Sequence, residues 1–353
     1  MLDGALLVAE DDPAVRLTLV GPPDQVSRLL AQRHATSLIG GPVRIHAARE
    51  LVGMAEDAVR GVRRKRDSTI RAAARLVRDG AADGCVSIGA TGATVAAARV
   101  TLGRVRGMSR PPLAVVVPAL AHPVVLLDVG AGTDATSTVM TQYCLAGAAY
   151  AKARLGLEHP RVGLLSVGAE PGKGDALRRR SGDHLAAALS ARGIDYVGNV
   201  EGSDVPLGGP ADVVVTDGFT GNVLLKGLEG AFGLFAGLSR RAAGGNGSAG
   251  SALAGLRPDQ VSGAMLLGVK GVVIVGHGAS DGNAVAACIR LAVDAYVGGW
   301  QRAVADAFLT AGHDEAPGRA DDGSPDGEAG PDQHDLVEHD QQHEHDRDQS
   351  DRT

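Results

Sequence analysis

The residues best suited to chemistry lie in the string GNVEGSDVPLGGPADVVVTDGFTGNVLLKGLEG, from Gly198 to Gly230. An apolar run at Ala211–Thr216 predicts a buried strand, and the sequence Asp217-Gly-Phe-Thr-Gly-Asn222 then opens a helix. Backbone N–H groups and the Asn222 amide converge at this turn, where an anion can sit. Lys226 follows one helical turn later on the same face. The sequence therefore predicts an anion-binding site, and the alternative is an ordinary turn whose glycines serve packing.

A second turn of this kind follows the strand predicted at Gly84–Gly89. Ala90-Thr91-Gly92-Ala93-Thr94 opens a helix there, so that backbone N–H groups again suit an anion. Further strands are predicted at Val124–Asp128 and Arg161–Val167, each followed by a glycine-rich loop.

Three glycine motifs resemble known signatures but lack their context. The spacing of Gly130, Gly132 and Ala135 mimics a dinucleotide fingerprint, but no acidic residue ends a second strand at the required distance. The loop 168–175 fails as a P-loop because its glycine spacing is one residue short and it lacks the Ser or Thr for magnesium. The segment 278–282 matches a nucleophile elbow without suitable triad partners downstream. We therefore expect no cofactor and no bound metal.

The charge of the chain is unevenly distributed. The chain has 353 residues and a net charge of −6, whereas residues 311–353 contain 14 acidic and 3 basic residues. The segment 311–353 is predicted to be a disordered acidic tail. His339, His343 and His345 lie close together in it, which we attribute to its biased composition and not to a metal site. The remaining part, 1–310, is mildly basic and is predicted to form one α/β domain with a Gly/Ala/Ser-rich insertion at about 242–258.

Cysteine usage and hydropathy indicate a cytoplasmic protein. The three cysteines have no C-x-x-C spacing, which is typical of reduced structural thiols. No signal peptide is expected because Asp3 occupies the place of a basic region. The most apolar stretch, 113–129, is interrupted by prolines and charged residues and cannot span a bilayer as a helix.

A basic cluster extends from Arg60 to Arg66 and leads into a helix with Asp67 or Ser68 as the expected N-cap. Its default interpretation is a solvated charged face, and the alternative is a surface that attracts an acidic partner. We expect no nucleic-acid partner, because one short basic cluster without interleaved aromatic residues is not typical of a nucleic-acid-binding surface.

The remaining elements complete an alternating pattern of strands and helices. We expect a helix at 2–10, a strand near 16–20 and a helix near 24–32, then a last strand at 268–276 and a long helix at 284–309.

The motifs together resemble the PlsX-type phosphate acyltransferases of bacterial phospholipid synthesis. The family pattern GNxEGxD followed by DVVVxDGFxGNxxLKxxEG is present at 198–204 and 212–230. Further matches are DGALLVAE at 3–10, SIGATGA at 87–93, GAEPGKG at 168–174 and HGAS at 277–280. The resemblance covers residues 3–300 apart from the loop near 245–258.

This resemblance implies a three-layer α/β/α, mostly parallel sheet related to the isopropylmalate dehydrogenases, working as a homodimer. It implies acyl transfer from acyl-acyl carrier protein to inorganic phosphate, which gives acyl phosphate for glycerol 3-phosphate acylation. The partners are then acyl carrier protein, phosphate and a downstream membrane acyltransferase. Peripheral contact with the inner face of the membrane, through Leu253 and Leu256, is a further hypothesis.

The resemblance also implies roles for individual residues. Lys173 would bind phosphate with the turn amides near Thr91 and Gly92, while Asn222 donates to phosphate or the thioester oxygen. His277 would protonate the leaving thiolate, and a buried structural histidine is the alternative. The remaining substrate-binding candidates are Asp217, Gly221, Lys226 and Glu201. The candidates for carrier-protein binding are Arg63, Arg64, Lys65 and Arg66.

The chain departs from the family pattern at several positions. Ala90 and Gly132 replace asparagines, Ala169 is also unusual, and the first family strand with its glycine-rich turn is expected to be absent. Two alternatives therefore remain: a short-chain phosphate acyltransferase that uses acyl-CoA, and a catalytically impaired remnant that acts as a binding protein.

Overall fold

The computed structural model describes residues 1–242, 263–278 and 280–311. The Gly/Ala/Ser-rich insertion expected beyond 242 and the acidic tail expected beyond 311 lie outside these residues, as do Leu253, Leu256 and the tail histidines. Everything described belongs to one compact unit, Met1–Asp314. In the described part, no helix is both long enough and apolar enough to cross a membrane.

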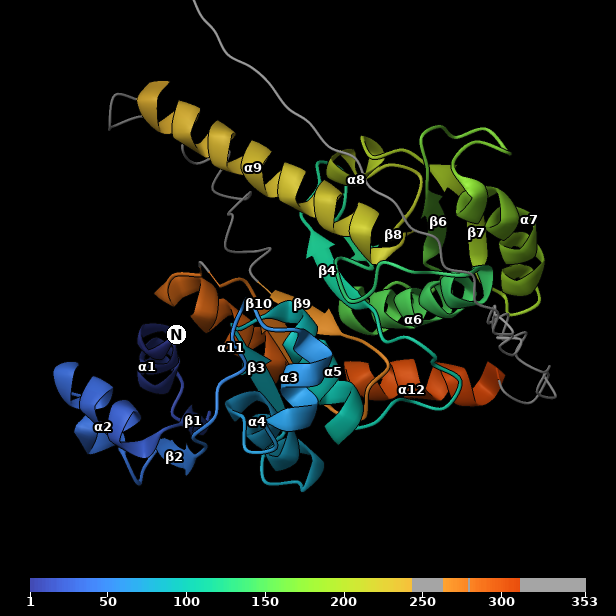
Figure 1. Cartoon of the computed structure of the whole chain (residues 1–353). Helices are drawn as coiled ribbons and strands as arrows, with labels where there is room; N and C mark the ends of the chain where they lie inside the picture. The colour runs from blue at the N-terminus through green and yellow to red at the C-terminus, as the bar shows by residue number, and fades with distance from the viewer. Residues whose placement is uncertain (243–262, 279, 312–353) are drawn as a thin grey trace, which may run out of the picture. The chain divides into compact units, whose positions relative to one another are not determined.

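Helices and strands alternate along most of the chain (Figure 1). The helices are α1 (Leu2–Asp11), α2 (Pro23–Gln32), α3 (Ala58–Arg64), α4 (Thr69–Arg78), α5 (Thr91–Thr101), α6 (Ser137–Leu155), α7 (Ala176–Ser190), α8 (Asp204–Leu207), α9 (Gly218–Ala242), α11 (Gly282–Val297) and α12 (Trp300–Ala311), with a 3₁₀ turn at Thr36–Leu38. The strands are β1 (Leu17–Gly21), β2 (Val43–Ala47), β3 (Gly84–Ser87), β4 (Leu113–Val117), β5 (Val124–Leu127), β6 (Arg161–Leu165), β7 (Asp195–Val200), β8 (Val213–Val215), β9 (Gly263–Leu266) and β10 (Val272–Gly276).

The central sheet has eight strands in the order β3-β10-β9-β4-β5-β8-β6-β7, and β1 and β2 form a separate parallel pair. Four of its pairings are parallel, and the three antiparallel ones join β10 to β9, β9 to β4 and β4 to β5. The expected α/β fold with a mostly parallel sheet is confirmed. Because of the reversals, β3 and β10 run opposite to β5, β8, β6 and β7.

These opposite directions define two rims of the sheet. We call the edge where β3 and β10 end the β3–β10 rim, and the edge where β5, β8, β6 and β7 end the β5–β8 rim. Helix α5 begins after β3 at the first rim, and it shares one hydrophobic cluster with Val129, which follows β5 at the second. Loops that the sequence predicts to be alike therefore leave the sheet in opposite directions.

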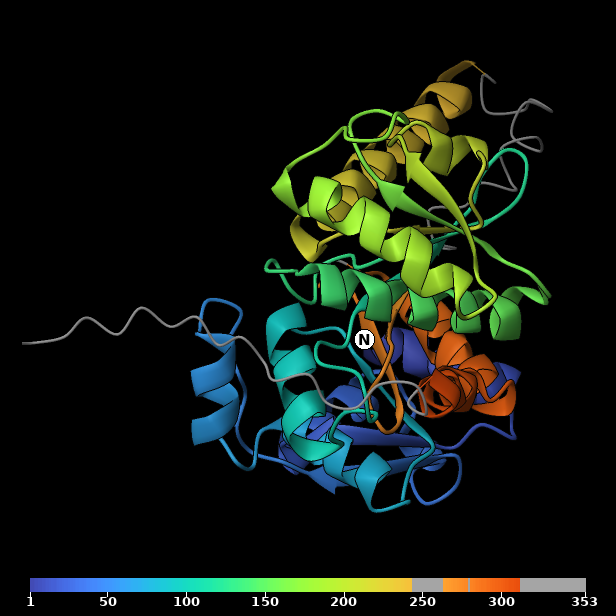
Figure 2. The same cartoon turned by 90° about the vertical axis from the view of Figure 1, so that its right-hand side faces the viewer.

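Alternate residues of the central strands pack into two different cores. Val125 and Leu127 pack with α6, α7, α11 and α12, whereas Val124 and Leu126 pack with α4, α5 and α9. Helix α12 packs along α6, where Tyr150 and Trp300 make an edge-to-face contact at 5.9 Å between ring centroids (Figures 1 and 2). The two helical layers around one sheet agree with the predicted three-layer arrangement.

Two expectations for the C-terminal part were wrong. The strand predicted at 268–276 begins only at Val272, because the preceding residues form the turn that reverses the chain between β9 and β10. The long helix predicted at 284–309 is two helices, α11 and α12, separated at Gly298 and Gly299. Gly299 has φ = +63°, a left-handed conformation that interrupts a right-handed helix.

Candidate functional site

At the β5–β8 rim, Asp217 anchors the start of α9. Its carboxylate accepts hydrogen bonds from the Thr220 N–H at 2.9 Å and the Thr220 hydroxyl at 2.8 Å. It also forms an ion pair with the buried Arg178 at 2.6 Å. Burial by itself would raise the pKa of Asp217, but the bonds from Thr220 and Arg178 outweigh it and hold that pKa below 3.8. Asp217 is therefore a charged cap of the helix.

Arg178 was missed by the sequence analysis, although it links the ends of two strands. Its guanidinium donates to the Leu165 carbonyl at 3.1 Å, the Asp175 carboxylate at 2.8 Å and the Thr216 hydroxyl at 2.7 Å. Asp175 also caps α7 by accepting from the Arg178 N–H. The spacing Asp175-x-x-Arg178 was the only local signal, since Asp217 and Thr216 come from a distant part of the chain.

Asp128 organises the neighbouring loop that follows β5. This fully buried carboxylate accepts from four backbone N–H groups, at 2.8 to 3.1 Å; these donors are Leu113, Gly130, Ala131 and Gly132. Burial raises the pKa of Asp128 to about 6, although the four N–H groups lower it. Three consecutive amides of this loop thus bind the protein's own carboxylate.

The loop after β5 (128–132) and the turn that opens α9 (217–222), which we call the signature loops, pack directly on each other. Asn222 donates its amide to the Val129 carbonyl at 2.9 Å, and Gly218 donates its N–H to Gly132. A Cβ atom on Gly221 would lie 1.9 Å from the Asp128 carbonyl oxygen, so only glycine fits at this contact. Asn222 therefore holds the loop after β5 with one of its side-chain N–H groups. Most backbone N–H groups of the turn 217–222, where the sequence predicts an anion site, have partners within the protein.

The other predicted residues of this rim are exposed. Lys226 forms an ion pair with Glu229 at 2.6 Å, and Glu201 donates its backbone N–H to Asp204. Lys173 lies over Gly168 and, in the described part of the chain, makes no ion pair. Of the two lysines, Lys173 is therefore the one available to an anion.

The β3–β10 rim brings together a different set of predicted residues. Thr91 and Gly92 begin α5, whose N-cap residue Ala90 provides no side-chain hydrogen bond. His277 directly follows β10, which lies beside β3 with Val275 opposite Ser87. Thr91, Gly92 and His277 thus leave adjacent parallel strands at one rim. Lys173 and Asn222 leave the sheet at the other rim, and no described hydrogen bond or ion pair joins the two sets.

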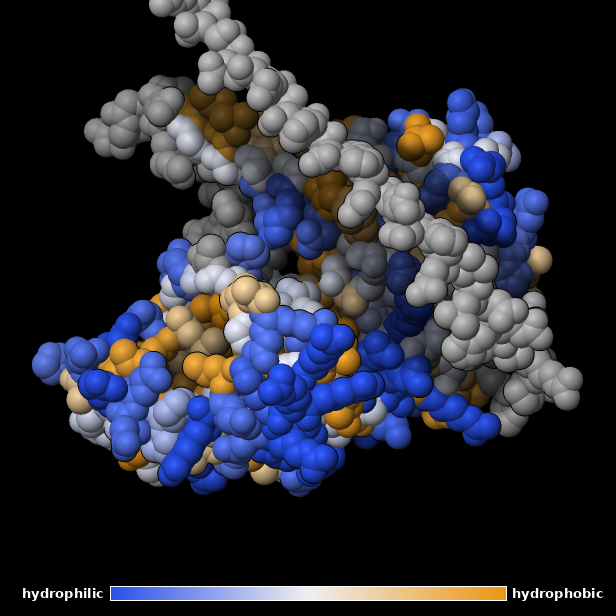
Figure 3. Space-filling model, in the orientation of Figure 1, coloured by the Kyte–Doolittle hydropathy of each residue, from blue (hydrophilic) through white to orange (hydrophobic). Residues whose placement is uncertain are grey.

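The basic cluster lies beside the start of α5. Gly92 packs on Ala58 of α3, and the face that carries α3 and α4 is mainly hydrophilic (Figure 3). Lys65 is engaged, because its ammonium donates to Glu56 at 2.6 Å and to the Leu51 carbonyl at 2.7 Å. Arg63, Arg64 and Arg66 are exposed. Three of the four residues predicted to meet an acidic partner are therefore accessible.

Sequence comparisons with known proteins agree on one family, and a comparison of structures shows a similar fold. A family model described as "Fatty acid synthesis protein" matches residues 1–301. A phosphate acyltransferase of Desulfitobacterium hafniense (strain DSM 10664 / DCB-2) is 38% identical over 297 residues, covering 81% of this chain and 86% of that protein. One of Thermobifida fusca (strain YX) is 40% identical over 304 residues and covers 80% of each chain. A branched-chain phosphotransacylase from Enterococcus faecalis V583 is similar in fold, with a TM-score of 0.51 and 16% identity over 80% of this chain and 99% of that one.

Proposed function

The chain belongs to the fatty acid synthesis protein family and is an acyltransferase of the PlsX type, and on this premise we propose that it transfers a fatty acyl group from acyl carrier protein to inorganic phosphate. The product, an acyl phosphate, would supply glycerol 3-phosphate acylation in phospholipid synthesis. The observation that carries the proposal is the β3–β10 rim, where the uncapped start of α5 lies beside His277 and the basic helix α3.

The proposed reaction needs an anion site, a proton donor and a route for the carrier. A phosphate oxygen attacks the thioester carbonyl carbon, a C–O bond forms, and the C–S bond breaks. The N–H groups of Thr91 and Gly92 hold the phosphate at the positive end of α5. His277, which is exposed at the same rim, gives a proton to the leaving thiolate. Arg63, Arg64 and Arg66 attract the acidic carrier protein.

Lys173 and Asn222 enter the same proposal from the β5–β8 rim. The ammonium of Lys173 supplies a cation for phosphate or its ester, and Asn222 keeps one amide N–H beyond its bond to Val129 for a substrate oxygen. We expect Lys173→Ala to lower acyl phosphate formation by about 10²–10³-fold. Lys152→Ala, at an exposed position on α6, is the matched control. Full activity of the Lys173 variant would remove this residue from the site.

The decisive experiment measures acyl phosphate from the purified chain with phosphate and either acyl-acyl carrier protein or acyl-CoA. We expect product with the carrier-bound donor and a much lower kcat/KM with acyl-CoA. The reverse preference would favour the short-chain enzyme. If neither donor reacts although the carrier protein binds, the chain is the non-catalytic remnant.

The finer predictions of fold and assembly belong to the same proposal. An isopropylmalate dehydrogenase-like fold is supported by the reversal of strand direction within one continuous sheet. We also propose that the protein is a cytoplasmic homodimer with peripheral membrane contact. An apolar face of α9 supports the dimer and the membrane contact. Its exposed members are Phe219, Val223, Leu234, Phe235 and Leu238. A monomer in light scattering would overturn the proposed homodimer. A protein that does not co-sediment with liposomes would overturn the proposed membrane contact.

A further inference from the structure

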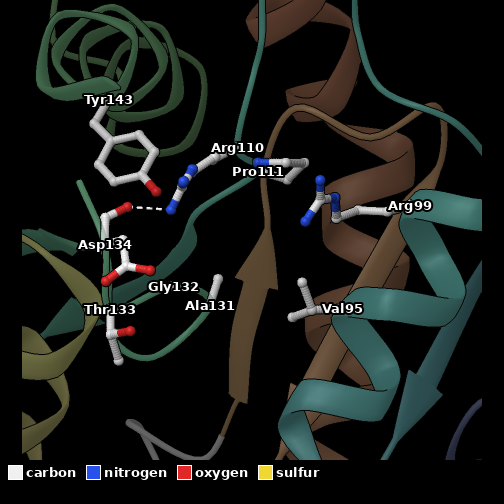
Figure 4. A pocket seen from close by; sticks show the side chains of 9 residues that line it. All are labelled: Val95, Arg99, Arg110, Pro111, Ala131, Gly132, Thr133, Asp134 and Tyr143. Carbon is white, nitrogen blue, oxygen red and sulfur yellow. Dashed lines mark hydrogen bonds between the residues drawn. The ribbon is translucent and has the colours of Figure 1, made fainter. Parts of the chain in front are cut away.

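A cavity of about 350 Å³ lies between α5 and the loop that follows β5 (Figure 4). Its lining residues are Val95, Arg99, Arg110, Pro111, Ala131, Gly132, Thr133, Asp134 and Tyr143. Arg99 reaches in from α5, and Arg110 lies beside Tyr143 and Asp134. The motifs that suggested a site from sequence include neither arginine, and the volume is within the range of small-molecule sites.

Positive charge gathers at this cavity, and no described ion pair neutralises it. Burial, together with the like charges of Arg104 and Arg110, holds the pKa of Arg99 below its ordinary value. Within the described residues, none of these three arginines forms an ion pair with an acidic side chain. Gathering like charges without counter-ions costs free energy, and a bound anion would recover it.

Asp134 is the acidic residue among those that line the cavity. Arg110 donates to the backbone carbonyl of Asp134 and not to its carboxylate. Asp128 accepts four backbone N–H groups. The backbone bond orients the Arg110 guanidinium, while Arg99 has no described hydrogen bond to the protein.

The two guanidinium groups come from separate elements, Arg99 from α5 and Arg110 from the segment before β4. Such an arrangement suits a tetrahedral phosphoryl group, whose oxygens project in several directions, better than a planar carboxylate that one guanidinium can hold. Thr133 adds a hydroxyl at the same wall, and Val95 and Pro111 provide apolar contacts beyond it.

The cavity is also connected to the signature loops. Its wall, 131–134, continues from the segment that Asn222 and Gly218 hold at Val129 and Gly132. A ligand in the cavity therefore touches the loop on which the start of α9 rests. This contact links the cavity to the reaction rather than to a remote surface.

From these observations we infer that the cavity binds a phosphoryl group of the substrates through Arg99 and Arg110. The identity of the ligand rests on the proposed function. The phosphoryl group comes either from the phosphate ester of the arm that links an acyl group to its carrier, which leaves free phosphate at Thr91 and Gly92, or from free phosphate. In the second case the cavity replaces the start of α5 as the phosphate site.

Arg99→Gln is the cleanest test, because this side chain supports no other described contact. Calorimetric titration with inorganic phosphate and the KM values for phosphate and for acyl carrier substrate are measured on the full chain. We expect a loss of about tenfold to a hundredfold in one of these affinities. Arg110→Lys, which keeps the charge but loses the planar fork, should fall between Arg99→Gln and the wild type.

The control is Arg28→Gln, at an exposed position of α2, which should match the wild type. A rise in the KM for phosphate identifies free phosphate as the ligand, and a rise only in the KM for the acyl donor identifies its ester; both support the inference. An Arg99→Gln variant with all three values within twofold of the wild type overturns it.

Failure of the proposed function gives a different result. If the wild type makes no acyl phosphate but binds phosphate, and Arg99→Gln loses that binding, the cavity assignment stands and the acyl transfer falls. If the wild type is active and Arg99→Gln is indistinguishable from it, the cavity assignment alone falls.

Discussion

The two rims of the sheet carry similar sequences with different physical properties. At the β5–β8 rim, Asp128, Asp175 and Asp217 bind the backbone amides of their own loops and helix starts. At the β3–β10 rim, Ala90 leaves the start of α5 without a side-chain cap. A glycine-rich turn before a helix is thus an internal joint in one place, and in the other it is the anion site that we propose. The residue at the cap decides which, because a carboxylate there competes with any external anion.

The largest expected effect concerns the internal joint. Arg178→Ala would leave Asp217 buried beside an empty space, and we expect the free energy of unfolding to fall by about 3–5 kcal/mol. Denaturant titration followed by circular dichroism measures the change. The exposed neighbour Arg180 is the control, since its alanine variant should stay within about 0.5 kcal/mol of the wild type. Equal stability of the two variants would contradict a structural role for this rim.

The open rim should show the opposite pattern, with activity lost and stability kept. His277→Ala removes an exposed side chain together with an interaction that it makes, so we expect the free energy of unfolding to change by no more than about 1 kcal/mol. Turnover of acyl carrier substrate should decrease by at least about 10²-fold. His159→Ala, also exposed, provides the comparison. If His277→Ala destabilises the fold and spares turnover, the structural alternative for this histidine is correct.

Converting the open rim into a capped one tests the comparison directly. Ala90→Asp places a carboxylate at the N-cap of α5 and should stabilise the protein by about 0.5–2 kcal/mol. The same charge should repel phosphate and raise its KM. Ala90→Asn provides the cap without the charge, so it should stabilise the protein with a smaller change in KM. Equal KM values for the two variants would place phosphate elsewhere.

A smaller effect is expected from the titration of Asp217. Its pKa is depressed in the folded chain, so its contribution to stability is complete above pH 3.8 and is lost as the pH falls through the lower folded value. The stability difference between the wild type and Asp217→Asn should therefore shrink on going from pH 5 to below pH 3.8. Urea titrations at each pH measure it, and a difference that grows on acidification would show that the pKa is raised instead.

Local patterns predicted many elements but not the direction of every strand. The segments that form β3, β5, β6 and β8, and the helices α1 and α2, were found from apolar runs and helix signals. Strands β4 and β9 and the break between α11 and α12 were not. An apolar run carries no information about the neighbour it pairs with, so the antiparallel insertion could not be read locally.

The sequence by itself determined the family and the strand-to-helix turns, and it supplied the candidate site residues, because these depend on residue type and short spacing. Only the tertiary structure separated Lys173 and Asn222 from Thr91 and His277, gave Asp217 its buried partner Arg178, and gathered Arg99 and Arg110 around one cavity. Strand direction and the pairing of charges distant in sequence decide these features. Both are set only when the strands assemble into the sheet and the side chains are buried.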